Sequence, residues 1–291
     1  MIEGHASSTA LGAAMMRAAH LLVDDDPKIM VDTYARAFLD PARRERATDT
    51  AIVGTTQTRW SRANIVARHA YAEAELADAV RNDDVGQYVL LGAGLDSSAL
   101  RHRELLAEVT TFEVDHPDTQ RYKRSVLAEL GELADIEAAG QLRLVPVNFE
   151  RDSLLESLRT AGWDPHRPTF WSWLGVTMYL TAAAIEGTLA AIATSAPGSR
   201  LITNYSVHDD DVDPADRSIR ARSAAGVSSS GEPWLSTFRH ADIVASVERI
   251  GFCDVASLDH RVMDERYFAG RTDGLTWRSP TAMLVATVPD V

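Results

Sequence analysis

Short runs of apolar residues alternate with amphipathic stretches along the chain from Gln87 onward. Apolar runs of this length with short connections predict buried strands, and the stretches between them predict helices on both faces of a parallel sheet. The pattern therefore predicts an α/β fold, with a Rossmann-like, doubly wound and mostly parallel seven-stranded sheet. The predicted strands are 88–92, 110–115, 142–147, 169–174, 199–205, 253–258 and 281–288, and the predicted helices are 96–107, 117–130, 151–161, 181–195 and 240–250.

Two segments do not follow this alternation. Residues 6–81 have a helical pattern, in which Ser61 is a candidate helix cap. Residues 206–239 are rich in Asp, Ser and Gly and separate the fifth predicted strand from the next helix. We predict a helical N-terminal cap over residues 1–82 and a core over residues 83–291, with an inserted lid at about 206–239.

Composition narrows the expected partners and compartment. The 291 residues include 45% hydrophobic ones, enough for a large core, and carry a formal charge of −13. So acidic a chain repels nucleic acid and anionic membranes, and we expect neither as a partner. No apolar run approaches the roughly 20 residues of a membrane span, and the N-terminal residues do not resemble a signal peptide. The single cysteine, Cys253, fits a cytoplasmic protein and is expected to be a small buried hydrophobe.

In an open α/β sheet, ligands bind at the carboxyl ends of the strands. The first predicted strand ends in Gly92, Ala93 and Gly94, which permit a tight turn and a close approach of the backbone to a ligand. Asp115 ends the second strand about 20 residues further on, the spacing at which a carboxylate can accept from a ribose diol. A routine strand-to-helix turn and an ordinary acid at a strand end are the alternative interpretations.

An acidic residue follows the glycines, where phosphate-binding turns offer bare backbone N–H groups. As a helix cap, Asp96 would occupy those donors and repel phosphate. The third glycine of GxGxxG is also missing, because position 97 is Ser. These features disfavour NAD and favour S-adenosyl-L-methionine, which has ribose and adenine, no phosphate and a cationic sulfur. At the end of the third strand, Asn148 and Phe149 are candidates to contact a base, and a helix cap is the alternative for Asn148.

Several segments together resemble one known family. They include SSTALGAAMMRAAH (7–20), VARHAYAEAEL (66–76), YVLLGAGLDSSALR (88–101), FEVDHPDTQRYKRSVL (112–127) and WLGVTMYLT (173–181). The chain resembles the class I S-adenosylmethionine-dependent methyltransferases of the leucine carboxyl methyltransferase type, including polyketide O-methyltransferase relatives. The resemblance covers residues 7–205 in order, and the succession of GAGLD, EVDxP and VPV is far more specific than any one of them.

The resemblance implies a cofactor site. Its residues would be Gly92, Ala93 and Gly94 around the cofactor, Asp115 at the ribose, Asn148 and Phe149 beside the adenine, and Arg68 at the methionine carboxylate. A guanidinium matches a carboxylate bidentately, and a solvated helix arginine is the alternative for Arg68. The chain departs from the family at Asn148-Phe149, often Asp-Leu, and at Leu174, often Glu. The second departure bears on the substrate more than on the cofactor.

Side chains after the fourth and fifth strands are candidates for the pocket of the methyl acceptor. They are Met178, Tyr179, Tyr205 and His208. The alternative for His208 is an exposed loop position, and the alternative for the other three is a position in the core. We assign no catalytic residue, because an ionised carboxylate acceptor needs no base. The acidic residues from Asp209 onward lack the glycine and glutamate of a calcium loop, so we predict no metal.

The combined prediction is a cytoplasmic S-adenosyl-L-methionine-dependent methyltransferase. It would methylate an oxygen of a small molecule of secondary metabolism, or of a carboxylate, by in-line displacement. An NAD-dependent oxidoreductase is a second hypothesis, since it uses the same strand, turn and acid. A non-catalytic protein that binds the cofactor is a third, motivated by Leu174.

Overall fold

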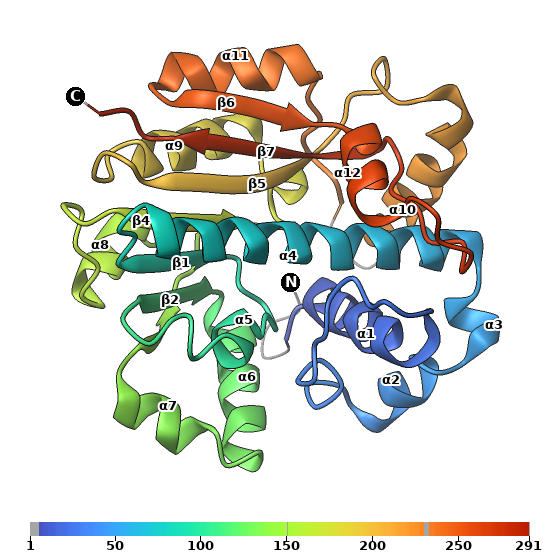
Figure 1. The fold of residues 1–291 in the computed structure, drawn as a ribbon, viewed down its shortest axis with the longest axis horizontal. Helices are drawn as coiled ribbons and strands as arrows, with labels where there is room; N and C mark the ends of the chain where they lie inside the picture. The colour runs from blue at the N-terminus through green and yellow to red at the C-terminus, as the bar shows by residue number, and fades with distance from the viewer. Residues whose placement is uncertain (1–5, 150, 230–232, 291) are drawn as a thin grey trace.

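A computed structural model describes residues 6–149, 151–229 and 233–290. Residues 1–5, 150, 230–232 and 291, which belong to the predicted cap, core and lid, lie outside the described part. Within it, seven strands form one sheet in the order β3-β2-β1-β4-β5-β7-β6 (Figure 1). They are β1 (Gln87–Leu91), β2 (Thr110–Asp115), β3 (Leu142–Pro146), β4 (Thr169–Trp173), β5 (Arg200–Ser206), β6 (Cys253–Leu258) and β7 (Thr281–Thr287).

The sheet is parallel except at one strand. β7 pairs antiparallel with both β5 and β6, whereas β1 to β5 pair in parallel. The strand order reverses direction between β1 and β4, which creates the crevice where open α/β sheets bind ligands. The predicted Rossmann-like, mostly parallel seven-stranded sheet is confirmed.

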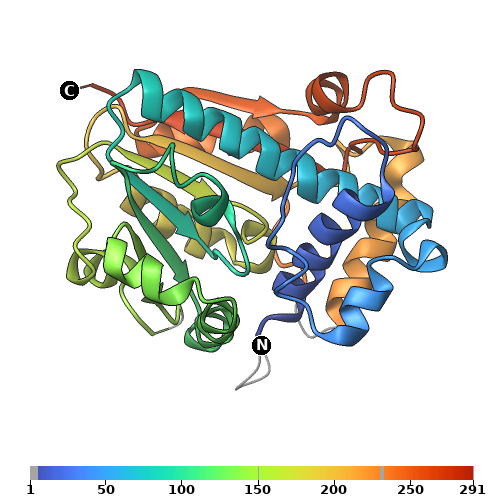
Figure 2. The same ribbon diagram turned by 60° about the horizontal axis from the view of Figure 1, so that its bottom comes forward.

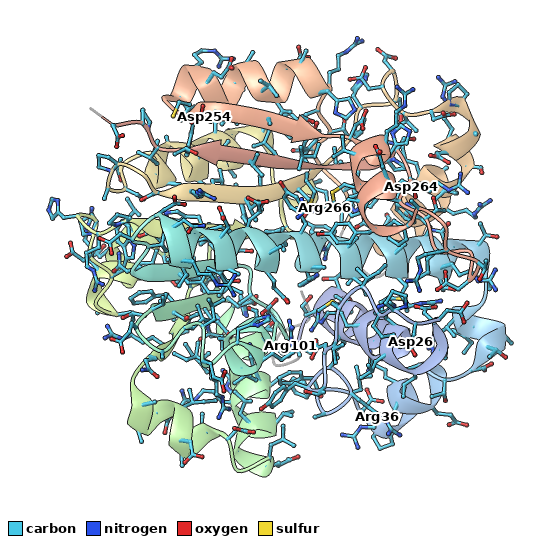
Figure 3. The ribbon with its side chains drawn as sticks, viewed as in Figure 1. Asp26, Arg36, Arg101, Asp254, Asp264 and Arg266 are labelled. Atoms are coloured by element: carbon cyan, nitrogen blue, oxygen red, sulfur yellow. The ribbon has the colours of Figure 1, made fainter. Side chains whose placement is uncertain are left out.

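Helices cover both faces of the sheet. One face packs on α8 (Leu154–Thr160), α9 (Ala182–Ile192) and α11 (His240–Ile250), in a core that includes Trp171 and Trp173. The other packs on the long α4 (Thr56–Asn82), which crosses the sheet in Figure 1. Arg266, labelled in Figure 3, lies over the Tyr71 ring of α4 and ties α12 (His260–Tyr267) to it.

The N-terminal segment forms a third cluster. It comprises α1 (Ser8–Val23), α2 (Pro41–Arg46), α3 (Thr50–Val53) and the turns between them, and it packs on α5 (Ser98–Arg101), α6 (Pro117–Glu129) and α7 (Leu133–Ala139). Figure 2 shows α10 (Arg217–Ser229) at the end of the molecule toward which the parallel strands point, and Gln57 of α4 donates to Ser223 of this helix. The predicted lid segment thus contains a helix, and it contacts the start of α4. The division into cap, core and lid stays a prediction.

Several predicted boundaries are wrong. α4 begins before Ser61, and Thr55 caps it by accepting from the Thr58 N–H. The helix predicted over 96–107 is only α5, because turns follow it. Cys253 is partly exposed at the start of β6 instead of buried. No helix among the described residues is both long and apolar enough to cross a membrane.

Candidate functional site

The glycine turn after β1 has a backbone that only glycine adopts easily. Gly92 and Gly94 have φ values of +65° and +54°, in the left-handed region. A Cβ on Gly92 would lie 2.3 Å from Cγ2 of Val176, and one on Gly94 would lie 3.2 Å from Cβ of Ala10. The turn therefore passes closely between the loop after β4 and helix α1, and Ala93 lies at its centre.

Asp115, at the carboxyl end of β2, is joined directly to this turn. Its Oδ2 accepts from the Gly94 N–H at 2.6 Å, and its Oδ1 accepts from the His116 N–H at 2.7 Å. Burial raises the pKa of Asp115, while these two backbone donors lower it. A carboxylate has about four lone-pair positions, so it can accept further bonds from a diol.

Asp96 lies inside the structure behind the turn. Its Oδ1 accepts from the N–H and the hydroxyl of Ser98, at 2.7 and 2.5 Å. The cap position of the four-residue α5 belongs to Ser97, so Asp96 precedes the position predicted for it. Burial opposes ionisation of Asp96, but the charges of His69 and Arg17 around it hold its pKa well below the usual range. Asp96 thus takes up the first N–H of α5, and its predicted repulsion of phosphate stays a prediction.

Helix α1 is fixed to the same loop by a buried arginine. Arg17 donates from Nε to Asp32 at 2.7 Å and from Nη2 to the Leu95 carbonyl at 2.6 Å. Arg101, labelled in Figure 3, extends the network from α5 by donating to Ser97 and by pairing with Glu73 of α4. The N-terminal segment, α4 and the loop after β1 are therefore joined by charged groups.

Arg68 of α4 is a half-buried cation next to the loop after β4. A Cβ on Gly175 would lie 2.6 Å from its Nη2. Its Nε is buried and has no hydrogen-bond partner among the described residues. Burial lowers the pKa of Arg68 to about 10, so the guanidinium is still charged at neutral pH. A guanidinium with a free donor fits a carboxylate from a ligand.

The end of β3 places one polar and one aromatic residue near Asp115. The Asn148 N–H donates to Asp152 at 2.8 Å, and the Val147 N–H pairs with the Asp115 carbonyl. Phe149 is 42% exposed, unusual for so large an apolar side chain. The alternative in which Asn148 caps the next helix is wrong, because α8 begins at Leu154 with Ser153 as its cap. Contact of Asn148 and Phe149 with adenine stays a prediction.

The four acceptor-pocket candidates are not brought together. Met178 is buried in the short helix η1 (Thr177–Tyr179), where its carbonyl accepts from Leu235, and Tyr179 of the same turn interacts electrostatically with Arg68. The prediction for Tyr205 is wrong, because this residue is in the core beneath α11, bonded to His240 and Ser257. His208 is partly exposed on a loop, 3.6 Å from Asp210.

The acidic residues after His208 are used in the fold. Asp209 pairs with Arg220, Asp210 with Arg239, and Asp211 accepts from the His240 N–H. No group of three potential metal ligands occurs in the described ranges.

Two polar residues that were not selected from the sequence, Asn204 and Ser206, lie at the carboxyl end of β5. No sequence signal separates them from the other polar residues of this strand, Arg200 and Thr203.

Comparison with known proteins adds independent information. A family model described as "Leucine carboxyl methyltransferase" matches residues 10–193. A Bacillus subtilis protein named "Putative S-adenosyl-L-methionine-dependent methyltransferase YktD" is 30% identical over 65% of this chain and 61% of its own. A Mycolicibacterium smegmatis protein with the same descriptive name is 36% identical over 69% of this chain and 67% of its own. The matched stretch thus spans less than two thirds of the Bacillus relative.

Solved structures share the fold. A duf574 family protein of Streptomyces avermitilis superimposes with a TM-score of 0.63 at 15% identity, over 96% of this chain and 97% of its own. A protein of Thermobifida fusca, described as "a putative methyltransferase", gives 0.60 at 13% identity, over 99% and 97%. At such identities the likeness concerns the arrangement of helices and strands alone.

Proposed function

Because the chain belongs to the leucine carboxyl methyltransferase family, we propose that it is an S-adenosyl-L-methionine-dependent methyltransferase. We propose further that the acceptor atom is an oxygen of a small molecule of secondary metabolism or of a carboxylate. Cys253, as the single cysteine, supports a cytoplasmic location. S-adenosyl-L-methionine supplies an electrophilic methyl group on a cationic sulfur.

The residues at the strand ends fit this cofactor. The turn from Gly92 to Gly94 offers close-lying backbone, and Asp115 has lone pairs left for the ribose hydroxyls. Asn148 and Phe149 lie beyond the neighbouring β3, where an adenine would follow the ribose. The observation that carries the proposal is the unpartnered Nε of Arg68, because a half-buried guanidinium calls for an anion such as the methionine carboxylate.

The proposal is tested by calorimetry on the purified protein. We expect S-adenosylmethionine and S-adenosylhomocysteine to bind one per chain and to raise the melting temperature, because ligand binding stabilises the folded state. NAD is the matched negative ligand, since it has the adenosine and the ribose but also a pyrophosphate that Asp96 disfavours. Absence of heat and of a thermal shift with both sulfur nucleosides would reject the proposal.

A further inference from the structure

His69 of α4 has a ring nitrogen whose role is fixed by its own helix. Its Nδ1 lies 2.6 Å from the carbonyl oxygen of Ile65, and a carbonyl can only accept, so Nδ1 carries a proton. Burial, together with the charges of Arg17 and Arg68, lowers the pKa of His69 to about 4. The ring is therefore uncharged at neutral pH, and its second nitrogen, Nε2, presents a lone pair.

This lone pair lies opposite a carboxylate instead of a donor. Nε2 of His69 is 3.5 Å from Oδ2 of Asp96, while Oδ1 of Asp96 accepts from Ser98. A protonated ring would donate to the carboxylate in a charged hydrogen bond, and such bonds are shorter, about 2.7–2.9 Å. The His69 ring lowers the pKa of Asp96 only while the ring is protonated, and Asp96 stays ionised when the ring loses its charge. At neutral pH the two facing atoms are thus both acceptors.

Neither acceptor receives a hydrogen bond from the residues that the structure describes. Two nearby cations are used elsewhere, since Arg17 donates to the Leu95 carbonyl. Lys123 donates to the backbone carbonyl of Asp96, not to its carboxylate. Asp96 and His69 are both buried, and native proteins rarely leave buried polar atoms without a partner. Two neighbouring acceptors without a donor indicate a ligand group that has several donors.

Arg68, which precedes His69 on α4, has the opposite requirement. Its buried Nε is a donor without an acceptor among the described residues. Arg68 lies close enough to Asp96 for the negative charge of Asp96 to raise the pKa of the guanidinium. A donor that lacks an acceptor is therefore near two acceptors that lack a donor. An α-amino acid is complementary to this arrangement, because its carboxylate and its ammonium are joined through one carbon.

We propose that His69 and Asp96 bind the ammonium group of the methionine portion of S-adenosyl-L-methionine, while Arg68 binds its carboxylate. The inference rests on the proposed function, and it gives Asp96 a second role besides its predicted repulsion of phosphate. An ammonium has three donors and can donate to both acceptors, and the ionised Asp96 balances its charge. It is about the size of a water molecule, and the side chains of His69 and Asp96 keep 8% and 10% of their surface open.

The test compares nucleosides that differ by one charged group. S-adenosylhomocysteine has both groups, its deamino analogue keeps only the carboxylate, and its decarboxylated analogue keeps only the amino group. All three have a neutral sulfur, so calorimetry reports the amino group without the charge of a sulfonium. We expect wild-type protein to bind S-adenosylhomocysteine at least about tenfold more tightly than the deamino analogue, because a charged hydrogen bond is lost.

His69→Met should remove this preference. Methionine fills a similar space without a ring nitrogen, and the Ile65 carbonyl still accepts from the backbone of the helix. We expect about tenfold weaker binding of the two ligands that have an amino group and unchanged binding of the deamino analogue. Asp96→Asn should have the same effect, because its NH₂ group would donate to Nε2 of His69 while its amide oxygen keeps the bonds from Ser98.

His166→Met is the matched control, since His166 is exposed before β4, at the opposite end of the sheet. We expect it to bind all three ligands as wild type does. The inference is overturned if wild-type protein binds the deamino analogue as tightly as S-adenosylhomocysteine, because His69 and Asp96 would then share only a water molecule. It is also overturned if His69→Met weakens all three ligands equally, or none of them. Failure of wild-type protein to bind S-adenosylhomocysteine at all would instead reject the proposed function.

Discussion

The backbone N–H of Gly94 donates to Oδ2 of Asp115 at 2.6 Å, which joins the turn after β1 to the end of β2. The two residues belong to adjacent parallel strands, in which Leu91 pairs with Val114. Because Asp115 is almost fully buried, the free N–H and the carboxylate would each be costly without the other. The contact therefore fixes the shape of the turn before any ligand arrives, and it places the carboxylate at the edge of the crevice.

Asp115→Asn should weaken cofactor binding strongly. The substitution keeps the shape of the side chain but removes the negative charge that favours ribose hydroxyls and the Gly94 N–H. We expect the affinity for S-adenosylhomocysteine, measured by calorimetry, to fall by about 10- to 100-fold, the usual cost of losing a charged hydrogen bond. Glu108→Gln is the control, because Glu108 is exposed before the opposite end of β2. Equal affinities of Asp115→Asn and wild type would contradict the assignment.

Arg68→Met should affect only ligands that have a carboxylate. We expect the variant to bind S-adenosylhomocysteine at least about tenfold more weakly, because the carboxylate of the ligand loses the guanidinium that we propose binds it. Binding of 5′-methylthioadenosine, which lacks the amino acid portion, should change little. Calorimetry with both ligands separates the two effects, and Arg81→Met, at an exposed position of α4, is the control. A similar loss for both ligands would show that Arg68 acts on the fold instead.

Much of the sheet could be predicted from sequence because its strands are short apolar runs bounded by turns. The sequence did not indicate that β7 inserts between β5 and β6, since pairing between distant strands leaves no local pattern. The length of α5 was also missed, because helical periodicity continues after Arg101 although the chain turns there. Thr55 and Ser61 are equivalent cap types, and only packing distinguishes them.

The candidate site also contains some residues that could be predicted from the sequence and others that could not. Gly94 and Asp115 could be selected from spacing alone, and the structure brings them into contact. Arg68 was selected only through the family resemblance, because nothing local separates it from a surface arginine. Asn204 was missed, because its hydrogen bond to Gly175 joins it to the loop after another strand and leaves no local pattern. Tyr205 was misplaced because alternation assigns it to one of two faces, and the sequence does not say which face is covered by α11.

Arg17→Met should destabilise the fold through the charge that it leaves behind. Asp32 is buried and loses its closest cation, while Arg101 remains at 3.8 Å. We expect a loss of about 3 kcal/mol in the free energy of unfolding, measured with guanidinium chloride. Adding Asp32→Asn should restore part of it, because the amide oxygen can still accept from the Tyr34 N–H while the charge is gone. Additive losses in the double variant would contradict this interpretation.

Ionisation of Tyr205 should lower the free energy of unfolding at alkaline pH. Burial raises the pKa of Tyr205 to about 12, so the folded protein holds this proton more tightly than the unfolded chain, whose phenol titrates near 10. Its contribution to stability is therefore fully present below pH 10 and is lost as pH rises toward 12, by up to about 3 kcal/mol. We expect the free energy of unfolding, measured at pH 8, 10 and 11, to fall more steeply for wild type than for Tyr205→Phe.

The Tyr205→Phe variant begins less stable, because His240 and Ser257 lose their shared partner, but these two side chains remain within 3.1 Å of each other. Parallel pH profiles would mean that Tyr205 titrates normally and that its hydroxyl is accessible to water, which would return it to the candidates for the acceptor pocket.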